Sequence, residues 1–133
     1  MKFLLDNNLP PRLAKALDAL CDGTEHHVHA LRELYPASTP DEEWLRLFAE
    51  DGGGAAVSGD LHIYTTKHQR EAWRQSGLTL FFLQPAWSKV RFWEKAAALV
   101  RWWPDFLQQV ETVAPGVGYE VPFGKRHLKL LRP

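Results

Sequence analysis

The sequence predicts one three-layer α/β domain in which helices cover both faces of a short parallel sheet of about four strands. Short apolar runs alternate with segments whose apolar residues recur at helical spacing. Glycine and proline separate these segments. The 133 residues, 45% of them hydrophobic, are enough for one core and too few for two ordinary domains. Strands that alternate with helices in this way favour a parallel sheet between two helical layers.

Three strands and two helices are predicted in the first half of the chain. The strands are expected at residues 2–5, 27–30 and 55–58. The first helix begins after Leu9, where two prolines fit a first helical turn, and stops at Asp22-Gly23. The second helix reaches about Glu50. It begins with a capping box, in which Thr39 bonds the backbone ahead and Glu42 reaches back.

The second half is predicted to add one strand and three helices before an irregular C-terminal stretch. A second capping box, at Thr66 and Gln69, starts the first of these helices. Prolines separate the later elements, because a proline ends a strand or begins a helix. The expected elements are a helix from Thr66 to Gly77, a strand at 78–83, a helix from Ser88 to about Trp102 and a helix from Pro104 to about Val113.

The expected strand order is 2-1-3-4, which makes the first and third strands neighbours. Asp6 follows the first strand and Asp60 follows the third, so both lie at the carboxyl edge of the sheet, where such folds bind ligands. Asp41 begins the second helix one turn before its apolar face and is expected to look toward the sheet. Each strand-end acid also has a structural interpretation, since Asp6 can bond the start of a helix and Asp60 can stabilise a turn.

Converging carboxylates at this edge predict a metal site. Mg²⁺ and Mn²⁺ prefer oxygen ligands and keep several waters. Next to a phosphodiester, such ions polarise the phosphoryl oxygen, activate water and stabilise the leaving oxygen. We therefore expect Asp6, Asp41 and Asp60 to meet in one pocket that supports nuclease chemistry.

Three segments of the sequence resemble the PIN-like proteins of the VapC type. They are MKFLLDNNLPP at 1–11, PDEEWL at 40–45 and AVSGD at 56–60. The resemblance covers residues 1–83, the expected sheet core and acidic site, and leaves 84–133 as C-terminal helices and basic tail of the same single domain. It implies a small α/β/α fold, RNA cleavage with Mg²⁺ or Mn²⁺, and inhibition by a cognate antitoxin protein in a type II toxin–antitoxin pair.

The resemblance also implies roles for individual residues. The catalytic, metal-holding acids would be Asp6, Asp41 and Asp60. Asn8 would shape the substrate side of the site, and Glu42 would be an alternate metal ligand. Many relatives have a glutamate in place of Asn7 and an acid in place of His62, so the site carries less negative charge. A catalytically weakened PIN-like module that binds a protein partner therefore stays open as an alternative.

The charges of the chain are divided between its two parts, although the net charge is zero. Residues 1–60 hold 5 Lys and Arg against 11 Asp and Glu, and the remainder holds the opposite balance. Lys67, Arg70 and Arg74 recur at helical spacing after Asp60 and are candidates for contacts with the phosphate backbone of RNA. A solvated helix face is the alternative, because Glu71 interrupts the stripe.

Four tryptophans in the C-terminal third predict a protein contact surface, for a homodimer or an antitoxin, because they supply more apolar area than a helix pair readily hides. They are Trp87, Trp93, Trp102 and Trp103. The basic tail at 125–132 adds charge that could meet an acidic partner or RNA. Closure of the core of a monomer is the alternative.

Two further features bear on the setting of the protein. The apolar runs are far shorter than the roughly 20 residues of a membrane span, and no export signal opens the chain. Cys21 is the single cysteine, so a reducing cytoplasmic setting is the simplest expectation. His26, His27 and His29 suggest a soft-metal site, but further ligands are not evident, and strand-end histidines are the favoured interpretation.

Overall fold

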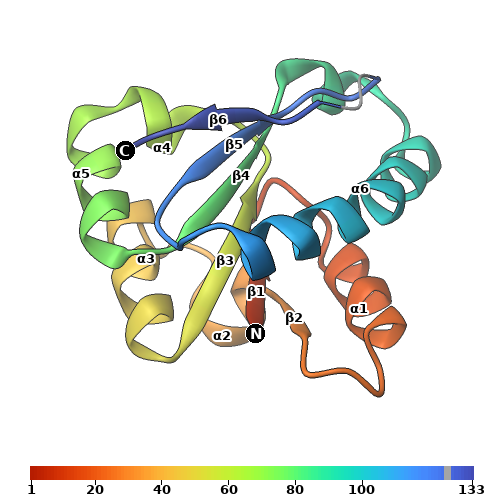
Figure 1. Cartoon of the computed structure of the whole chain (residues 1–133), viewed down its shortest axis with the longest axis horizontal. Helices are drawn as coiled ribbons and strands as arrows, with labels where there is room; N and C mark the ends of the chain where they lie inside the picture. Colours follow the sequence, from red (N-terminus) through yellow and green to blue (C-terminus); the bar gives the residue numbers. More distant parts are fainter. Residues whose placement is uncertain (125–126) are drawn as a thin grey trace.

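The computed structural model describes residues 1–124 and 127–133 as an α/β domain with one six-stranded sheet between helices (Figure 1). The strands lie in the order β2-β1-β3-β4-β5-β6. All neighbours pair in parallel except β5 and β6, which are antiparallel. The strands are β1 (Lys2–Leu5), β2 (His27–Ala30), β3 (Gly53–Ser58), β4 (Thr79–Leu83), β5 (Gly118–Val121) and β6 (Lys129–Leu131).

The helices divide between the two faces of the sheet, as Figure 1 shows with α3, α4 and α5 on its left and α1 and α6 on its right. Alternate strand residues point to opposite faces, so Phe3 and Leu5 pack in the core under α1 and α6 and Leu4 packs in the core under α3 and α5. The helices are α1 (Pro11–Leu20), α2 (Leu31–Leu34), α3 (Asp41–Glu50), α4 (His62–Thr65), α5 (Lys67–Ser76) and α6 (Phe92–Thr112), with a 3₁₀ turn, η1, at Pro85–Lys89.

The three-layer α/β class is confirmed, but the prediction of about four strands is wrong because β5 and β6 extend the sheet. The first four strands do have the order 2-1-3-4. The two additional strands lie in the stretch that was expected to be irregular. Gly118 begins β5 just after a Pro-Gly turn, and β6 has only three residues, so neither carries a strand pattern long enough to recognise. The sheet thus extends well beyond residue 83.

The predicted pair of C-terminal helices is a single 21-residue helix, α6, with Pro104 inside it. Proline removes one hydrogen bond from a helix, but burial of Trp103 and Phe106 against the sheet holds the segment on both sides of the proline. The helix expected to start at Ser88 is also wrong. Ser88 donates to the carbonyl of Pro85 within η1, and α6 begins four residues later.

Neither predicted capping box forms. Pro40 is the residue before α3, and the Thr39 hydroxyl donates instead to the carbonyl of Pro36 at 2.6 Å. Thr66 does precede α5, but its side chain makes no capping bond. The predicted end of this helix at Gly77 is confirmed, because Gly77 follows α5 with a left-handed φ of 73°, a conformation that favours glycine.

Burial of the tryptophans contradicts the prediction that four of them form one contact surface. Trp87, Trp102 and Trp103 lie in the core between α6 and the sheet. The long α6 covers more of the sheet than two short helices would, and β5 widens the surface that it covers. Trp93 alone of the four is exposed.

Two predictions about the setting can be compared with the described residues. Cys21, the single cysteine, is free and buried. None of the described helices combines the length and apolar character needed to cross a membrane. Lys125 and Arg126 of the predicted basic tail lie outside the described residues.

Candidate acidic site at the carboxyl edge of the sheet

Asp6 lies buried at the carboxyl end of β1. Its backbone N–H continues the sheet by donating to Val57 at 3.1 Å, and the chain then turns, with the N–H of Leu9 donating to the carbonyl of Asp6. The Oδ1 of Asp6 accepts hydrogen bonds from the backbone N–H groups of Asn8 at 3.0 Å and Gly59 at 3.3 Å. A short acidic side chain that bonds the backbone two residues ahead is typical of a turn, so the local sequence itself orients this carboxylate.

Asp60 lies two residues after β3 and is exposed. Its Oδ1 accepts from the N–H of His62 at 2.7 Å, which fixes the start of α4. Its Oδ2 accepts from the side-chain amide of Asn8 at 2.9 Å. Asn8 therefore holds both carboxylates, Asp6 through its backbone N–H and Asp60 through its amide. It was predicted to bind substrate, and the contacts observed here are to the two acids.

Gly59 permits this arrangement, because the turns after β1 and β3 approach each other there. A Cβ atom at residue 59 would lie 2.3 Å from the Cβ of Asn8, far inside van der Waals contact. Any other residue would therefore push the two turns apart. A small residue between two strand-end polar groups is a signal of close approach that the sequence itself carries.

The electrostatics of the site centre on Asp6. Burial raises the pKa of Asp6 to about 6, and the negative charge of Asp60 adds to the increase. Hydrogen bonds from Ser58 and from the N–H groups of Asn8 and Gly59 act in the opposite direction. At neutral pH the site thus holds a buried anion next to a second carboxylate.

This donor set fits a hard divalent cation. A buried carboxylate is unfavourable unless something compensates its charge. Among the described residues, no lysine or arginine forms an ion pair with Asp6 or Asp60. Oxygen ligands are the preference of Mg²⁺ and Mn²⁺, and a bound cation would supply the missing positive charge.

Asp41 lies at the first position of α3, on the same edge of the sheet. Only two residues separate the end of α3 from the start of β3 at the amino edge, so the beginning of the helix lies toward the carboxyl edge. The Oδ1 of Asp41 accepts from the indole N–H of Trp44 at 2.9 Å, one turn along. Among the described residues, Asp41 forms no hydrogen bond with Asp6 or Asp60, and the three acids do not have ligand atoms all within 4.8 Å of one another. Their convergence on one metal ion stays a prediction.

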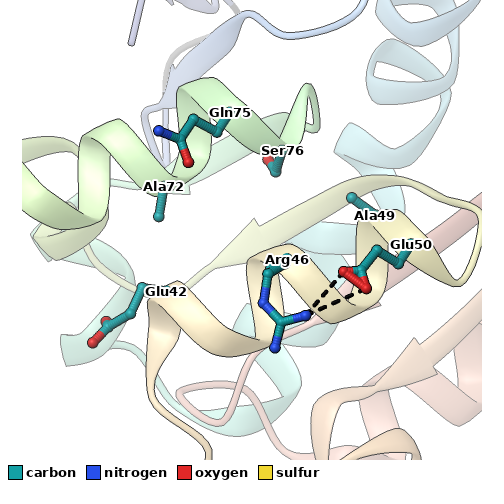
Figure 2. A pocket seen from close by; sticks show the side chains of 7 residues that line it. All are labelled: Glu42, Arg46, Ala49, Glu50, Ala72, Gln75 and Ser76. Carbon is teal, nitrogen blue, oxygen red and sulfur yellow. Dashed lines mark hydrogen bonds and ion pairs between the residues drawn. The ribbon is translucent and has the colours of Figure 1, made fainter.

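Glu42, the predicted alternate ligand, lines a groove between α3 and α5 of about 550 Å³ (Figure 2). In Figure 2 its carboxylate points away from the other labelled side chains, while Arg46 is held by Glu50 through a hydrogen bond of 2.9 Å. Ala72 and Ser76 face the groove from α5. Its role as a metal ligand also stays a prediction.

The predicted basic stripe lies on α5, beyond Asp60 in the chain. Arg74 is held by Glu71, so the charge of Arg74 is partly neutralised. Lys67 is exposed, and the guanidinium of Arg70 lies 5.7 Å from the ring centroid of Tyr64. All three cations line a pocket of about 670 Å³ that Arg132 completes from the C-terminal end. The spacing of cations along α5 could not predict that Arg132 lines the same pocket, because Arg132 reaches the pocket through the pairing of β6 with the sheet.

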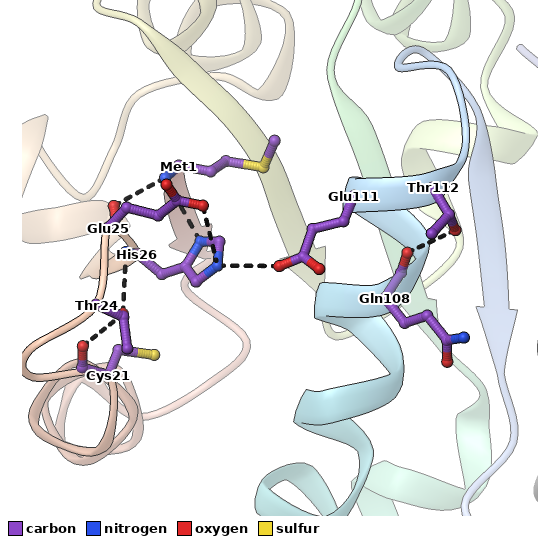
Figure 3. A network of polar contacts seen from close by, with 8 residues as sticks. All are labelled: Met1, Cys21, Thr24, Glu25, His26, Gln108, Glu111 and Thr112. Carbon is purple, nitrogen blue, oxygen red and sulfur yellow. Dashed lines mark hydrogen bonds and ion pairs between the residues drawn. The ribbon is translucent and has the colours of Figure 1, made fainter.

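A second polar cluster lies at the opposite, amino edge of the sheet (Figure 3). The Nε2 of His26 lies 3.4 Å from Glu111 and 3.9 Å from Glu25, and one ligand atom from each of these residues lies within 4.8 Å of the others. Among the described residues, these three are the group of His, Cys, Asp or Glu side chains that lies close enough together to hold one metal ion. The amino group of Met1 lies 3.5 Å from the Nδ1 of His26. His26 therefore already has partners on both ring nitrogens.

The other two histidines of that segment have separate acidic neighbours. His27 lies 3.8 Å from Asp18, and His29 lies 3.9 Å from Glu33. The three histidines do not share a ligand cluster among the described residues. His27 and His29 therefore add nothing to the cluster, whereas His26 has in Glu25 and Glu111 the further candidate ligands that the sequence did not make evident.

The fold is a mostly parallel α/β sheet between helices, and Asn8 joins the carboxylates of Asp6 and Asp60 at its carboxyl edge. The sequence model of the PIN-like domain family matches residues 1–85 of the 133. The chain therefore belongs to the PIN-like domain family. PIN domains are generally metal-dependent nucleases. Comparisons with curated proteins and with solved structures give no match.

Proposed function

We propose that this protein is a divalent-metal-dependent ribonuclease with Asp6 and Asp60 at its centre. The observation that carries the proposal is the buried carboxylate of Asp6, held beside Asp60 by Asn8 at the carboxyl edge of the sheet in a PIN-like domain. A structural acid at this position would be expected to have a cationic partner, and none of the described lysines or arginines supplies one. A metal ion would both stabilise this edge and perform chemistry there.

Asp6 and Asp60 would hold Mg²⁺ or Mn²⁺, with Asp41, or Glu42 in its place, as a further ligand. The bound ion would polarise a phosphodiester and activate water for its hydrolysis. Asn8 and the N–H of Gly59 orient the two carboxylates through neutral hydrogen-bond donors. The negative charges of Asp6 and Asp60 would therefore stay available to the ion. Lys67 and Arg70 would bind phosphates of the RNA on the α5 side, since both lie on the helix that follows Asp60.

The biological role that we propose is that of the toxin of a type II toxin–antitoxin pair, acting on RNA in the cytoplasm and inhibited by a cognate antitoxin. The resemblance to VapC-type proteins in the turn after β1 supports this role. Expression of the protein should then arrest bacterial growth, and co-expression of the product of the neighbouring reading frame should relieve the arrest. Growth that continues while the purified protein cleaves RNA would leave a ribonuclease that is not a toxin.

The catalytic proposal is tested with Asp6→Asn, which keeps the shape and the hydrogen-bond acceptor but removes the charge. We expect the variant to lose Mn²⁺-dependent cleavage of single-stranded RNA while keeping its circular dichroism spectrum. Asp22→Asn, at an exposed acid at the far end of α1, is the matched control and should cleave like the wild type. A variant at Asp6 that cleaves as fast as the wild type would assign the activity to another site or to a contaminant.

The same cleavage assay tests the alternative that this chain is a catalytically weakened PIN-like module, which the histidine at position 62 suggested. If the wild-type protein cleaves no RNA with Mg²⁺ or Mn²⁺, the ribonuclease proposal is wrong. His62→Asp should then be compared with the wild type, since it restores an acid next to Asp60. Cleavage by this variant alone would show that the site has lost its activity by that replacement.

A further inference from the structure

Trp93 is the exception among the tryptophans of this protein. It lies in the first turn of α6 with 78% of its surface exposed, whereas the other five tryptophans are each at most 5% exposed. An indole ring is among the largest apolar surfaces that a side chain can present to water. Its indole is therefore available to a partner from outside the chain, and its neighbours decide which chemistry such a partner would have.

The neighbours of Trp93 form an ordered aromatic and cationic surface. The guanidinium of Arg12, from α1, lies 3.5 Å from the ring centroid of Phe92, which is stacking distance. Phe92 in turn meets Trp93 edge-on, with ring centroids 5.2 Å apart at 74°. The ring of Phe92 therefore contacts both the guanidinium of Arg12 and the exposed indole of Trp93, and holds the cation near the indole. We call Arg12, Phe92 and Trp93 the α1–α6 platform.

The charge around the platform is mainly positive. Lys89 and Arg91 are exposed just before Trp93, and Lys95 follows it, while Glu94 is the one acid in the segment 85–104. None of these cations forms an ion pair with a described acid. A polyanion is therefore a better match for this surface than an apolar protein face.

The platform lies on the same edge of the sheet as the acidic site. Each helix that follows a parallel strand begins at the carboxyl edge, and both α1 and α6 do so (Figure 1). Arg12 is six residues from Asp6, so even a fully extended chain would place them at most about 20 Å apart. The turn at Asp6–Leu9 shortens this separation. The α5 cations lie across the sheet from the platform, on the side of α3.

We propose that the α1–α6 platform stacks an unpaired base of a single-stranded RNA that lies across the acidic site, with Trp93 as the stacking ring and Arg12 as its cationic neighbour. This inference rests on the proposed ribonuclease function. Aromatic rings that stack bases, combined with cations that track the backbone, are the usual means of binding single strands without sequence preference. The arrangement makes an unpaired strand, and not a duplex, the substrate class.

The test measures binding separately from cleavage. Fluorescein-labelled oligouridine is titrated in EDTA against the Asp6→Asn protein, with and without a change at Trp93, by fluorescence anisotropy. Trp93→Ala should weaken binding about 10-fold, because the stacking of one base on the indole ring is lost. Trp93→Phe should recover most of the affinity. Leu20→Ala, at a 66% exposed side chain at the other end of α1, is the control and should change nothing.

The outcomes separate this inference from the proposed function. If Trp93→Ala binds oligouridine like its parent, or weakens binding to a blunt RNA duplex equally, the platform does not stack a base even if the wild type cleaves RNA. If the wild type cleaves nothing but Trp93→Ala still loses binding, the platform stands and the ribonuclease proposal falls. Unchanged RNA binding together with a dimer that dissociates in Trp93→Ala would show that the surface is a protein contact.

Discussion

At the scale of single residues, the carboxylate of Asp6 couples the stability of the protein to pH. An unfolded chain releases this proton near the ordinary value of 3.8, whereas burial raises the folded-state pKa to about 6. Between these values the folded protein holds a proton that the unfolded chain lacks. Stability must therefore fall as pH rises through this window, and above it the full penalty of the buried charge applies.

Asp6→Asn should remove this penalty. At pH 7.5 without divalent ions, we expect its free energy of unfolding in urea to exceed that of the wild type by up to about 3 kcal/mol, the equivalent of the shift in pKa. Well below the unfolded-state pKa of 3.8 the difference should disappear, because the wild-type carboxyl is then neutral in both states. Equal stability at both pH values would show that Asp6 is not a buried anion.

Divalent ions supply the complementary measurement. Ligands that bind only the folded state stabilise it, so Mn²⁺ should raise the melting temperature of the wild type at pH 7.5. Asp6→Asn should respond much less. A shift of the same size in both proteins would place the ion elsewhere, with the cluster of Glu25, His26 and Glu111 as the next site to examine.

Gly59 offers a test of the geometry of the site. Gly59→Ala would place a Cβ 2.3 Å from that of Asn8, so the turn after β1 must move and the bond between Asn8 and Asp60 must lengthen or break. We expect cleavage to fall at least 10-fold, because misplacing catalytic groups by about 1 Å has a large effect on rate. Gly124→Ala is the control, since a Cβ there meets nothing within 4 Å.

At the scale of elements, the sequence predicts the parts of the fold that have local patterns. The first four strands and the helices that begin after Leu9 and near Asp41 occur where apolar spacing and turn residues place them. The positions of Asp6 and Asp60 after β1 and β3 were also predicted, because both acids follow apolar runs, whereas their role as metal ligands stays a prediction. The last two strands were not, since their pairing depends on β4 and on each other more than on their own short sequences.

Contacts between distant segments explain what sequence reasoning missed at the site. The approach of Asn8 to Gly59 joins two turns that are 51 residues apart in the chain. Arg132 reaches the α5 pocket only because β6 adds to the edge of the sheet. Trp93 and three other tryptophans were predicted to form one contact surface, because nothing in the sequence shows that α6 is one continuous helix. That helix buries the other three tryptophans against the sheet.

The continuity of α6 leads to a prediction about Pro104. The ring lacks the N–H that would bond the carbonyl of Val100, and it stands in an otherwise regular helix. Pro104→Ala should restore that bond and raise the free energy of unfolding by about 1–3 kcal/mol, measured in urea. A lower stability would show that the ring, which also lines a small apolar pocket with Leu17 and Trp103, contributes more by packing.

At the scale of the whole molecule, the two halves of the chain carry opposite charges of equal size. The acids of the first half include Asp6 and Asp60 at the carboxyl edge of the sheet. The cations of the second half include those of α5, Arg132 and those near the start of α6, on either side of this edge. Under the proposed function, a protein with zero net charge would bind a polyanion where the cations gather, while the acids would hold metal ions between them.

This arrangement predicts a salt dependence for RNA binding that is larger than the zero net charge suggests. If Lys67, Arg70, Arg132 and Arg12 each contact one phosphate, the logarithm of the binding constant should fall with the logarithm of salt concentration with a slope of about −3, since each contact on a single strand contributes roughly −0.7. The measurement is anisotropy of labelled oligouridine with the Asp6→Asn protein across a salt series in EDTA. Lys67→Gln should reduce the slope by about 0.7. Lys2→Gln is the matched control, because Lys2 donates to the carbonyl of Asp51 at the amino edge of the sheet, away from the proposed strand. A slope near zero, or one that Lys2→Gln changes as much as Lys67→Gln does, would mean that the cations around the carboxyl edge do not bind the RNA backbone.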